Sequence, residues 1–160
     1  MTENILSSEI IDFFMQMPVF GRMNAEELKV VARQMSVIEL DEGEILFRES
    51  EKGSFVCFIS EGELDVIKTS ETSDEGVILA TLHKGHSIGE MSIIDDCPRS
   101  ATVKARKTAL LYILSKSAFD MILEKHSKIG IKLLKGISKM LSENLRETSK
   151  RLADFIPSLS

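Results

Sequence analysis

Residues 88–103 read IGEMSIIDDCPRSATV, and this stretch governs how the rest of the chain is interpreted. Gly89 and Glu90 open a short apolar turn. Pro98 stops any helix begun there, and Arg99 and Ser100 follow it directly. Free backbone N–H groups at a helix start attract an anion, a guanidinium offers a planar fork of donors to phosphate oxygens, and a carboxylate accepts from a sugar hydroxyl. The stretch therefore predicts a site for one small phosphorylated sugar.

Short alternating strands surround this stretch from Val37 to Leu114, broken by glycine and acidic turns. The apolar runs lie at residues 38–40, 45–47, 55–59, 64–67, 77–80, 101–105 and 109–114. A count of about eight strands at this spacing is typical of a barrel or a double-layered roll. We expect a mainly β fold with flanking helices, built on an eight-stranded β-roll of the jelly-roll type.

Helical periodicity precedes the strands. Residues 8–14 place apolar side chains at helical spacing, and Pro18 ends that segment. A second helix is expected to start at Asn24, which can form a capping box with Glu27. We predict a single domain over residues 1–160, with N-terminal helices in 1–36, the β-roll in 37–114 and C-terminal helices in 115–156.

Two helices are predicted after the roll. Ser117 is expected to cap the first, which runs to about Lys125, and Ser127 to cap a long second helix reaching about Phe155. Along that second helix, spacings alternate between 3 and 4 at residues 131, 134, 138, 141, 145, 148, 152 and 155. A period of 3.5 is typical of helix pairing in a coiled coil, although so narrow a stripe could also pack on its own roll.

The stretch at 88–103 resembles the phosphate-binding cassette of the cyclic-nucleotide-binding domain family. That family includes bacterial catabolite activator proteins, regulatory subunits of cAMP-dependent kinases and cyclic-nucleotide-gated channels, and the resemblance covers roughly residues 15–155. It implies that the amides of Gly89 and of the following Met91 and Ser92 approach the cyclic phosphate. Glu90 would then accept from the ribose 2′-hydroxyl.

The same resemblance assigns roles to three residues that follow Pro98. Arg99 would pair with the phosphate, Ser100 would add a hydroxyl or amide contact, and Ala101 would leave room for the ligand. The family often caps the base from the last helix with a hydroxyl or amide, which points to Asn144, with Thr148 one turn further. The expected ligand is cAMP, possibly cGMP, bound by a regulatory module that is not an enzyme.

The resemblance also implies partners. It favours a parallel homodimer through residues 131–155 and a separate, unidentified effector protein. Family members that bind DNA carry a helix-turn-helix domain after this helix. This chain ends at Ser160, so we expect no direct DNA binding.

Two other readings stay open. In the first, Glu90 and Arg99 form an ordinary surface ion pair on a ligand-free β-roll scaffold. In the second, His83, His86 and Glu90 hold a metal, as in metal-dependent cupins. The spacing of the two histidines disfavours that reading, because strand residues three apart point to opposite faces. We therefore expect no metal.

Composition limits the remaining classes of function. The net charge of −5 argues against nonspecific affinity for nucleic acid. Cys57 and Cys97 lack metal-ligand spacing, and Cys57 lies in an apolar run typical of a core. With no signal sequence and no apolar run of about 20 residues, we expect no membrane span and a cytoplasmic location.

Overall fold

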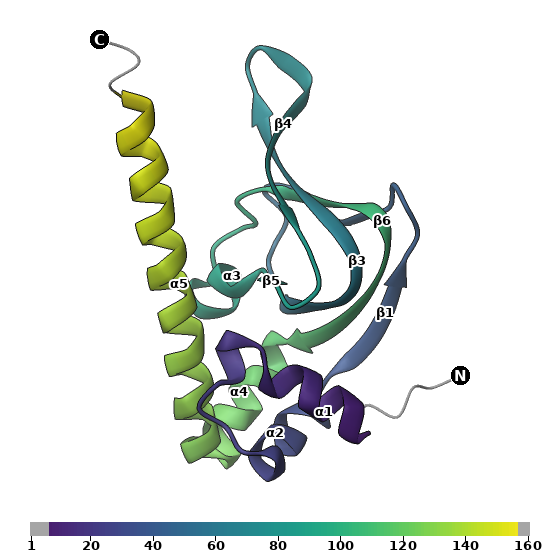
Figure 1. Ribbon diagram of the computed structural model, residues 1–160, viewed down its shortest axis with the longest axis vertical. Coiled ribbons are helices and arrows are strands. Elements are labelled where there is room, and N and C mark those ends of the chain that lie inside the picture. The colour runs from purple at the N-terminus through teal and green to yellow at the C-terminus, as the bar shows by residue number, and fades with distance from the viewer. Residues whose placement is uncertain (1–6, 157–160) are drawn as a thin grey trace.

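An antiparallel sheet of six strands curls on itself at the centre of the computed structural model, which describes residues 7–156 (Figure 1). The main path runs in the order β1, β6, β3, β4, while β2 pairs with β6 and β5 pairs with β3. The strands are β1 Ser36–Leu40, β2 Ile45–Phe47, β3 Phe55–Ser70, β4 Ser73–Leu82, β5 Ser87–Ile88 and β6 Thr102–Ser115. The predicted mainly β fold with flanking helices is confirmed.

The prediction of eight strands is wrong for the described part of the chain, because β3 and β6 are long and each joins two of the expected strands. The glycine at residue 62 reads as a turn in the sequence. In the structure Gly62 has φ of +89° and lies against the backbone of Thr108 and Ala109, where a Cβ would collide. The register of β3 on β6 shifts between Ile59 and Leu64. The chain therefore bulges at this glycine and continues in the same sheet.

The N-terminal helices cover one end of the sheet. They are α1 Ser8–Met15, a short 3-10 helix η1 Pro18–Phe20, and α2 Ala25–Ala32. The predicted capping box is confirmed, because the Glu27 amide donates to the Asn24 side chain at 2.9 Å and the Asn24 amide donates to Glu27 at 3.2 Å. Phe14 packs edge-on against Tyr112 of β6 with ring centroids 5.0 Å apart, which anchors these helices on the sheet.

Two helices follow β6, namely α4 Lys116–Lys125 and α5 Ser127–Phe155. Their lengths agree with the prediction, but both predicted caps are wrong. Ser115, the last residue of β6, caps α4 by accepting from the Ala118 amide at 3.1 Å. The Ser127 hydroxyl donates back to the Leu123 carbonyl, so it closes the turn of α4 and does not cap α5. The strand passes into α4 without a loop, which moves the cap to the end of the strand.

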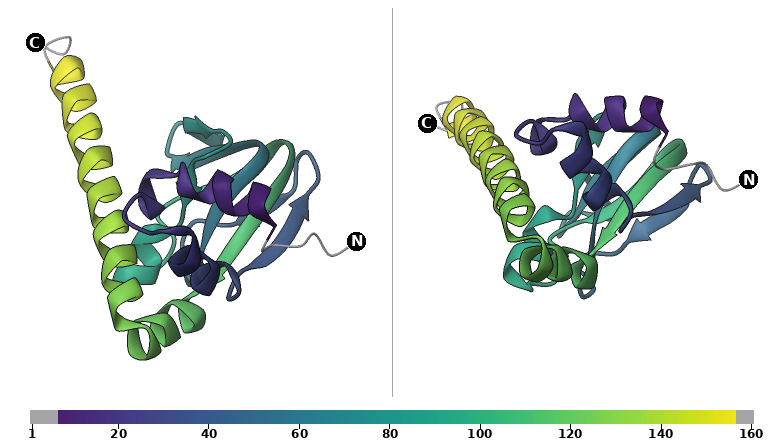
Figure 2. Two further views of the ribbon diagram at one scale, coloured as in Figure 1. Left: turned by 60° about the horizontal axis from the view of Figure 1, so that its bottom comes forward. Right: turned by 90° about the horizontal axis from the view of Figure 1, so that it is seen from below.

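Only the first half of α5 packs on the rest of the molecule. Leu133 and Ile137 are buried, and Gly136 approaches the Val19 carbonyl so closely that a Cβ would overlap it. From residue 142 onward every described residue of α5 is exposed, and the helix extends past the N-terminal helices as an arm (Figure 2). On the predicted seam, Leu145 and Leu152 are more than half exposed, so that face has room for a partner helix.

The buried apolar side chains form two clusters. One joins the N-terminal helices, α4 and the base of α5 to one end of the sheet, and it includes Phe20, Leu28 and Leu133. The other fills the inside of the roll, around Ile59 and Leu111. No helix within residues 7–156 is both long and apolar enough to cross a membrane.

Candidate functional site

The predicted cassette forms a loop and a short helix between β5 and β6. Helix α3 spans Glu90–Asp95, and Gly89 precedes it with φ of +95°, a left-handed conformation that favours glycine. A Cβ on Gly89 would also meet the guanidinium of Arg99 and the carbonyl of Phe55. The glycine therefore allows the start of α3 to lie directly against the arginine.

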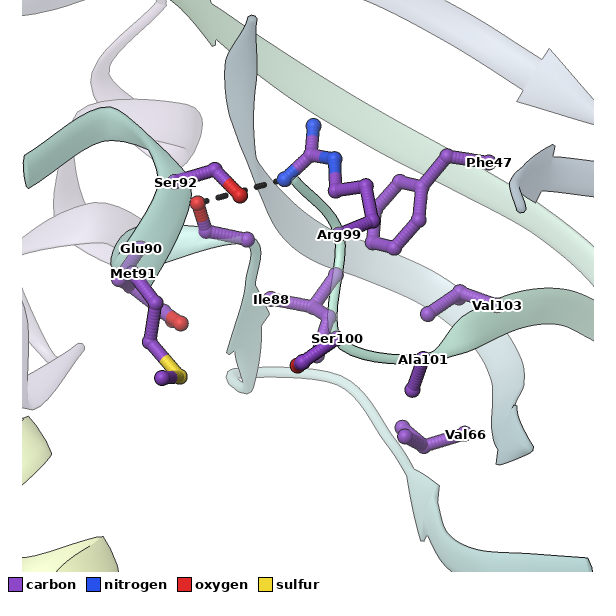
Figure 3. Close-up of a pocket in the computed structure, with 11 residues that line it drawn as sticks. Phe47, Val66, Ile88, Glu90, Met91, Ser92, Arg99, Ser100, Ala101 and Val103 are labelled. Atoms are coloured by element: carbon purple, nitrogen blue, oxygen red, sulfur yellow. Dashed lines mark hydrogen bonds between the residues drawn. The ribbon is translucent and has the colours of Figure 1, made fainter. Parts of the chain in front are cut away.

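Arg99 is the centre of the site and is only 4% exposed. Its Nη2 donates to the Phe55 carbonyl at 2.8 Å. Its Nη1 donates to the Gly89 carbonyl at 3.4 Å, the bond that reaches Arg99 as a dashed line in Figure 3. The guanidinium also stacks on Phe47, 3.9 Å from the ring centroid, and lies 4.6 Å from that of Phe55. Its Nε is buried without a hydrogen-bond partner in the described structure. Burial lowers the pKa of this guanidinium, and the nearby Glu90 and Glu51 carboxylates oppose that shift without forming a direct ion pair.

Backbone hydrogen bonds hold Arg99 in this place. Its amide donates to the Glu51 carbonyl at 2.7 Å, and its carbonyl accepts from the Ser50 amide at 2.8 Å. Lys68 on β3 adds a side-chain contact, because its Nζ donates to the Ser100 carbonyl at 2.7 Å. The loop that carries the arginine is thus fixed on the roll from two sides.

Glu90 is the second buried ionisable group of the site, at 5% exposure. Its Oε1 accepts from the Ser87 hydroxyl. Burial raises the pKa of Glu90, and the hydrogen bond from Ser87 opposes that rise. Glu90 and Arg99 form neither a surface pair nor a direct ion pair, so the reading of these residues as an ordinary surface ion pair is wrong.

Two adjoining cavities contain the predicted site residues. The smaller, of about 80 Å³, is lined by Gly89, Glu90, Met91, Ser92, Arg99, Ser100 and Ala101 together with apolar side chains. The larger, of about 670 Å³, lies between the roll, α3 and α5, and Asn144 and Thr148 line it from α5. Both cavities share Val66, Ile88, Glu90 and Met91. The larger volume falls in the range of about 300–1,000 Å³ that small-molecule sites occupy.

Sequence reasoning missed several residues of the site. Phe47 and Phe55 support the guanidinium, while Val66, Ile88 and Val103 line the smaller cavity. They come from four strands, and along the chain each is an ordinary apolar strand residue, so no local signal marks them. Ser87, by contrast, is a polar residue three positions before Glu90, and its nearness in sequence could have suggested the contact.

The histidines take no part in this site. His83 and His86 lie in the turn between β4 and β5, where the His83 amide donates to Nδ1 of His86 at 2.8 Å. Among residues 7–156 there is no group of three His, Cys, Asp or Glu side chains that could hold a metal ion. Cys57 is fully buried, as predicted, and burial raises the pKa of its thiol.

Two relatives are similar to this chain in sequence. The chain is 30% identical over 128 residues to a cAMP-dependent protein kinase regulatory subunit of Mycosarcoma maydis, an alignment covering 72% of this chain and 24% of that protein. It is 34% identical over 108 residues to the cGMP-dependent protein kinase egl-4 of Caenorhabditis elegans, covering 64% of this chain and 13% of the kinase. The chain thus spans a quarter or less of the length of these relatives.

Solved structures have the same fold as this chain. A cyclic nucleotide-binding domain from Methylobacillus flagellatus superposes with a TM-score of 0.81 at 29% identity, covering 94% of this chain and 82% of that one. The catabolite activator protein of Thermus thermophilus, at 22% identity, shares the fold with a TM-score of 0.75 over 85% of this chain and 62% of that one. The family model for the cyclic nucleotide-binding domain matches residues 37–126, more than half of the chain and the whole of the cassette. The chain therefore belongs to the family of cyclic nucleotide-binding domains.

Proposed function

We propose that this chain binds a 3′,5′-cyclic nucleotide, preferably cAMP, in the two adjoining cavities, and acts as a regulatory module on a separate partner protein. The observation that carries the proposal is Arg99. A buried guanidinium whose hydrogen bonds go to carbonyls and whose faces meet aromatic rings, with Nε unpartnered, has no direct ion pair in the described structure. A cyclic phosphate supplies one anion with several acceptor oxygens, and hydrogen bonds to charged groups are the strong ones.

Glu90 and the larger cavity fit the rest of such a ligand. The Glu90 carboxylate lines both cavities, so a ribose hydroxyl next to the phosphate would reach it. The base would then enter the larger cavity, whose lining is mostly apolar and which Asn144 and Thr148 close from α5. The Asn144 amide can accept from the amino group of adenine, whereas in part of the family a threonine at the place of Ser100 serves guanine. Both points favour cAMP over cGMP.

The signal would leave the site through α5. A ligand that contacts Arg99 on the roll and Asn144 on α5 at the same time favours the position of the helix that allows both contacts. The named relatives are regulatory or kinase chains, which supports a partner protein as the receiver of the signal. A ligand-free scaffold is the alternative function, and binding measurements distinguish the two.

Calorimetric titration with cAMP and cGMP tests the proposal, using the unsubstituted protein and Arg99→Ala. We expect micromolar or tighter binding of cAMP and weaker binding of cGMP. Arg99→Ala should weaken cAMP binding about 10- to 150-fold, which corresponds to about 1.5–3 kcal/mol for a hydrogen bond to a charged group. Arg106→Ala, which removes an exposed arginine of β6 that pairs with Asp65, is the matched control and should leave affinity unchanged. Equal affinities of the Arg99 variant and the parent would remove the basis of the proposal, and no binding at all would favour the scaffold.

A further inference from the structure

Ser87 connects the buried carboxylate of the site to the long helix. Its hydroxyl donates to Oε1 of Glu90 and lies 3.0 Å from the sulfur of Met140 on α5. A hydroxyl has one proton to donate, and a carboxylate is a far stronger acceptor than a thioether. The proton therefore belongs to the bond with Glu90, while Met140 covers the hydroxyl from the side of α5.

The hydrogen bond from Ser87 occupies only one of the two carboxylate oxygens of Glu90. A carboxylate can accept about four hydrogen bonds through its two oxygens, so Oε1 can be held by Ser87 while Oε2 stays available. Ser87 and Glu90 both line the larger cavity, and the side chain of Glu90 is almost fully buried. Without this donor the carboxylate would lose a group that orients it, and only its own backbone N–H and the charge of Arg99 would oppose the desolvation that raises its pKa.

We infer that Ser87 is a positioning residue of the ligand site, whose hydroxyl holds the Glu90 carboxylate ionised and turned toward the hydroxyl of a bound sugar. The inference rests on the proposed function for the identity of the ligand, and on the contacts of Ser87 for the role itself. Ser87 is not expected to touch the nucleotide. Its effect reaches the ligand through Glu90.

The charge environment of Glu90 defines how this role depends on pH. From β3 the carboxylate faces the thiol of Cys57, which burial keeps neutral, and from the loop before β6 it faces the Arg99 guanidinium. The other ionisable groups along the larger cavity are Asp95 on α3 itself and Glu147 and Arg151 on α5. Ser87 is the neutral donor among these groups, so Ser87→Ala removes a hydrogen bond and changes no charge.

The test compares the affinity for cAMP with that for 2′-deoxy-cAMP, in the parent and in Ser87→Ala, from about pH 8 to about pH 5. The ratio of the dissociation constant of 2′-deoxy-cAMP to that of cAMP measures the contribution of the ribose 2′-hydroxyl, because the other effects of pH on the two ligands cancel. In Ser87→Ala the ratio should fall about 2- to 10-fold at neutral pH, the equivalent of one ordinary hydrogen bond. The fall should deepen toward acid pH, because the carboxyl without Ser87 has a higher pKa and protonates earlier.

Two further variants and one spectroscopic measurement test whether the effect comes from the Ser87 hydroxyl. Ser87→Thr keeps the hydroxyl and should restore the ratio, and Ser142→Ala, an exposed serine on α5, should leave it unchanged. Carboxyl carbon resonances of Glu90 in the unliganded protein should show a higher pKa in Ser87→Ala than in the parent. An unchanged ratio at every pH and an unchanged Glu90 pKa would overturn the role of Ser87 while leaving cAMP binding intact. A parent that binds both nucleotides equally, or neither, would overturn instead the proposed role of Glu90, and that of Ser87 with it.

Discussion

The Glu90 carboxyl is buried, which disfavours its charged form, and this affects the folded protein even without a ligand. Burial raises the pKa of its carboxyl above the ordinary value of 4.5. Between the ordinary and the raised pKa, the folded protein binds more protons than the unfolded chain. The contribution of Glu90 to stability therefore falls as pH rises through this window.

Glu90→Gln should consequently gain stability relative to the parent as the pH increases. We expect the difference in the free energy of unfolding between variant and parent to be more favourable to the variant at about pH 7 than at about pH 4, because only the parent must keep a buried charge at neutral pH. Urea denaturation at both pH values measures it. Glu61→Gln, which changes an exposed carboxylate of β3, is the control. A difference that does not change with pH would contradict this account of Glu90.

The residues of the cassette could be predicted because chemistry and spacing coincide in one short segment. Gly89, Glu90, Arg99 and Ser100 lie within twelve positions of the sequence, and all four line the smaller cavity. Phe47 and Phe55 could not be predicted as partners of Arg99, since a stacking ring has no signature beyond being apolar. Their role exists only once β2 and β3 are folded around the arginine.

Among the elements, α5 packs against η1 at a glycine. Gly136 faces the Val19 carbonyl of η1, and there is no space for a Cβ. In an exposed helix, alanine would be more favourable than glycine by about 1 kcal/mol. Here overpacking costs about 1–3 kcal/mol and opposes that gain.

Gly136→Ala should therefore destabilise the protein, and a larger residue, as in Gly136→Val, should destabilise it more. Thermal unfolding followed by circular dichroism provides the measurement. Ser142→Ala, at an exposed position of the same helix, is the control for helix propensity and should not lower the melting temperature. A melting temperature that rises in Gly136→Ala would show that α5 does not rest on η1 as the structure has it.

The ends of the helices and the number of strands differ in how far the sequence determines them. The length of α5 follows from a regular apolar period that stops at Phe155, and the structure agrees. The number of strands cannot be predicted from the sequence, because a glycine such as the one at 62 is equally typical of a turn and of a bulge. Only the partner strand decides between them, through the contact of Gly62 with Ala109. Likewise Ser115 and Ser117 are both competent caps, and the place where β6 ends selects the first.

At the scale of the whole molecule, the exposed seam of α5 predicts a dimer. Leu141→Asp combined with Leu145→Asp would place charges in that seam and should give monomers in multi-angle light scattering. Both leucines also line the larger cavity, so Leu152→Asp, which lies outside that lining, separates assembly from ligand binding. Leu152→Asp should weaken the dimer and retain affinity for cAMP. A parent protein that is already monomeric at tens of micromolar would refute the dimer.

The close approach of Gly136 to Val19 would also let α5 act as a lever in the proposed function. The helix rises about 1.5 Å per residue, so its free end at Phe155 lies about 29 Å beyond this fulcrum. Asn144 and Thr148 sit roughly 12 and 18 Å along that arm, where the larger cavity opens. A tilt of about 5° that moves Asn144 by roughly 1 Å would move the tip by about 2.5 Å, since displacement grows in proportion to distance from the fulcrum. In the proposed function, the unpacked half of the helix would therefore enlarge a small adjustment around the ligand into a larger displacement at Phe155, where a partner protein could detect it.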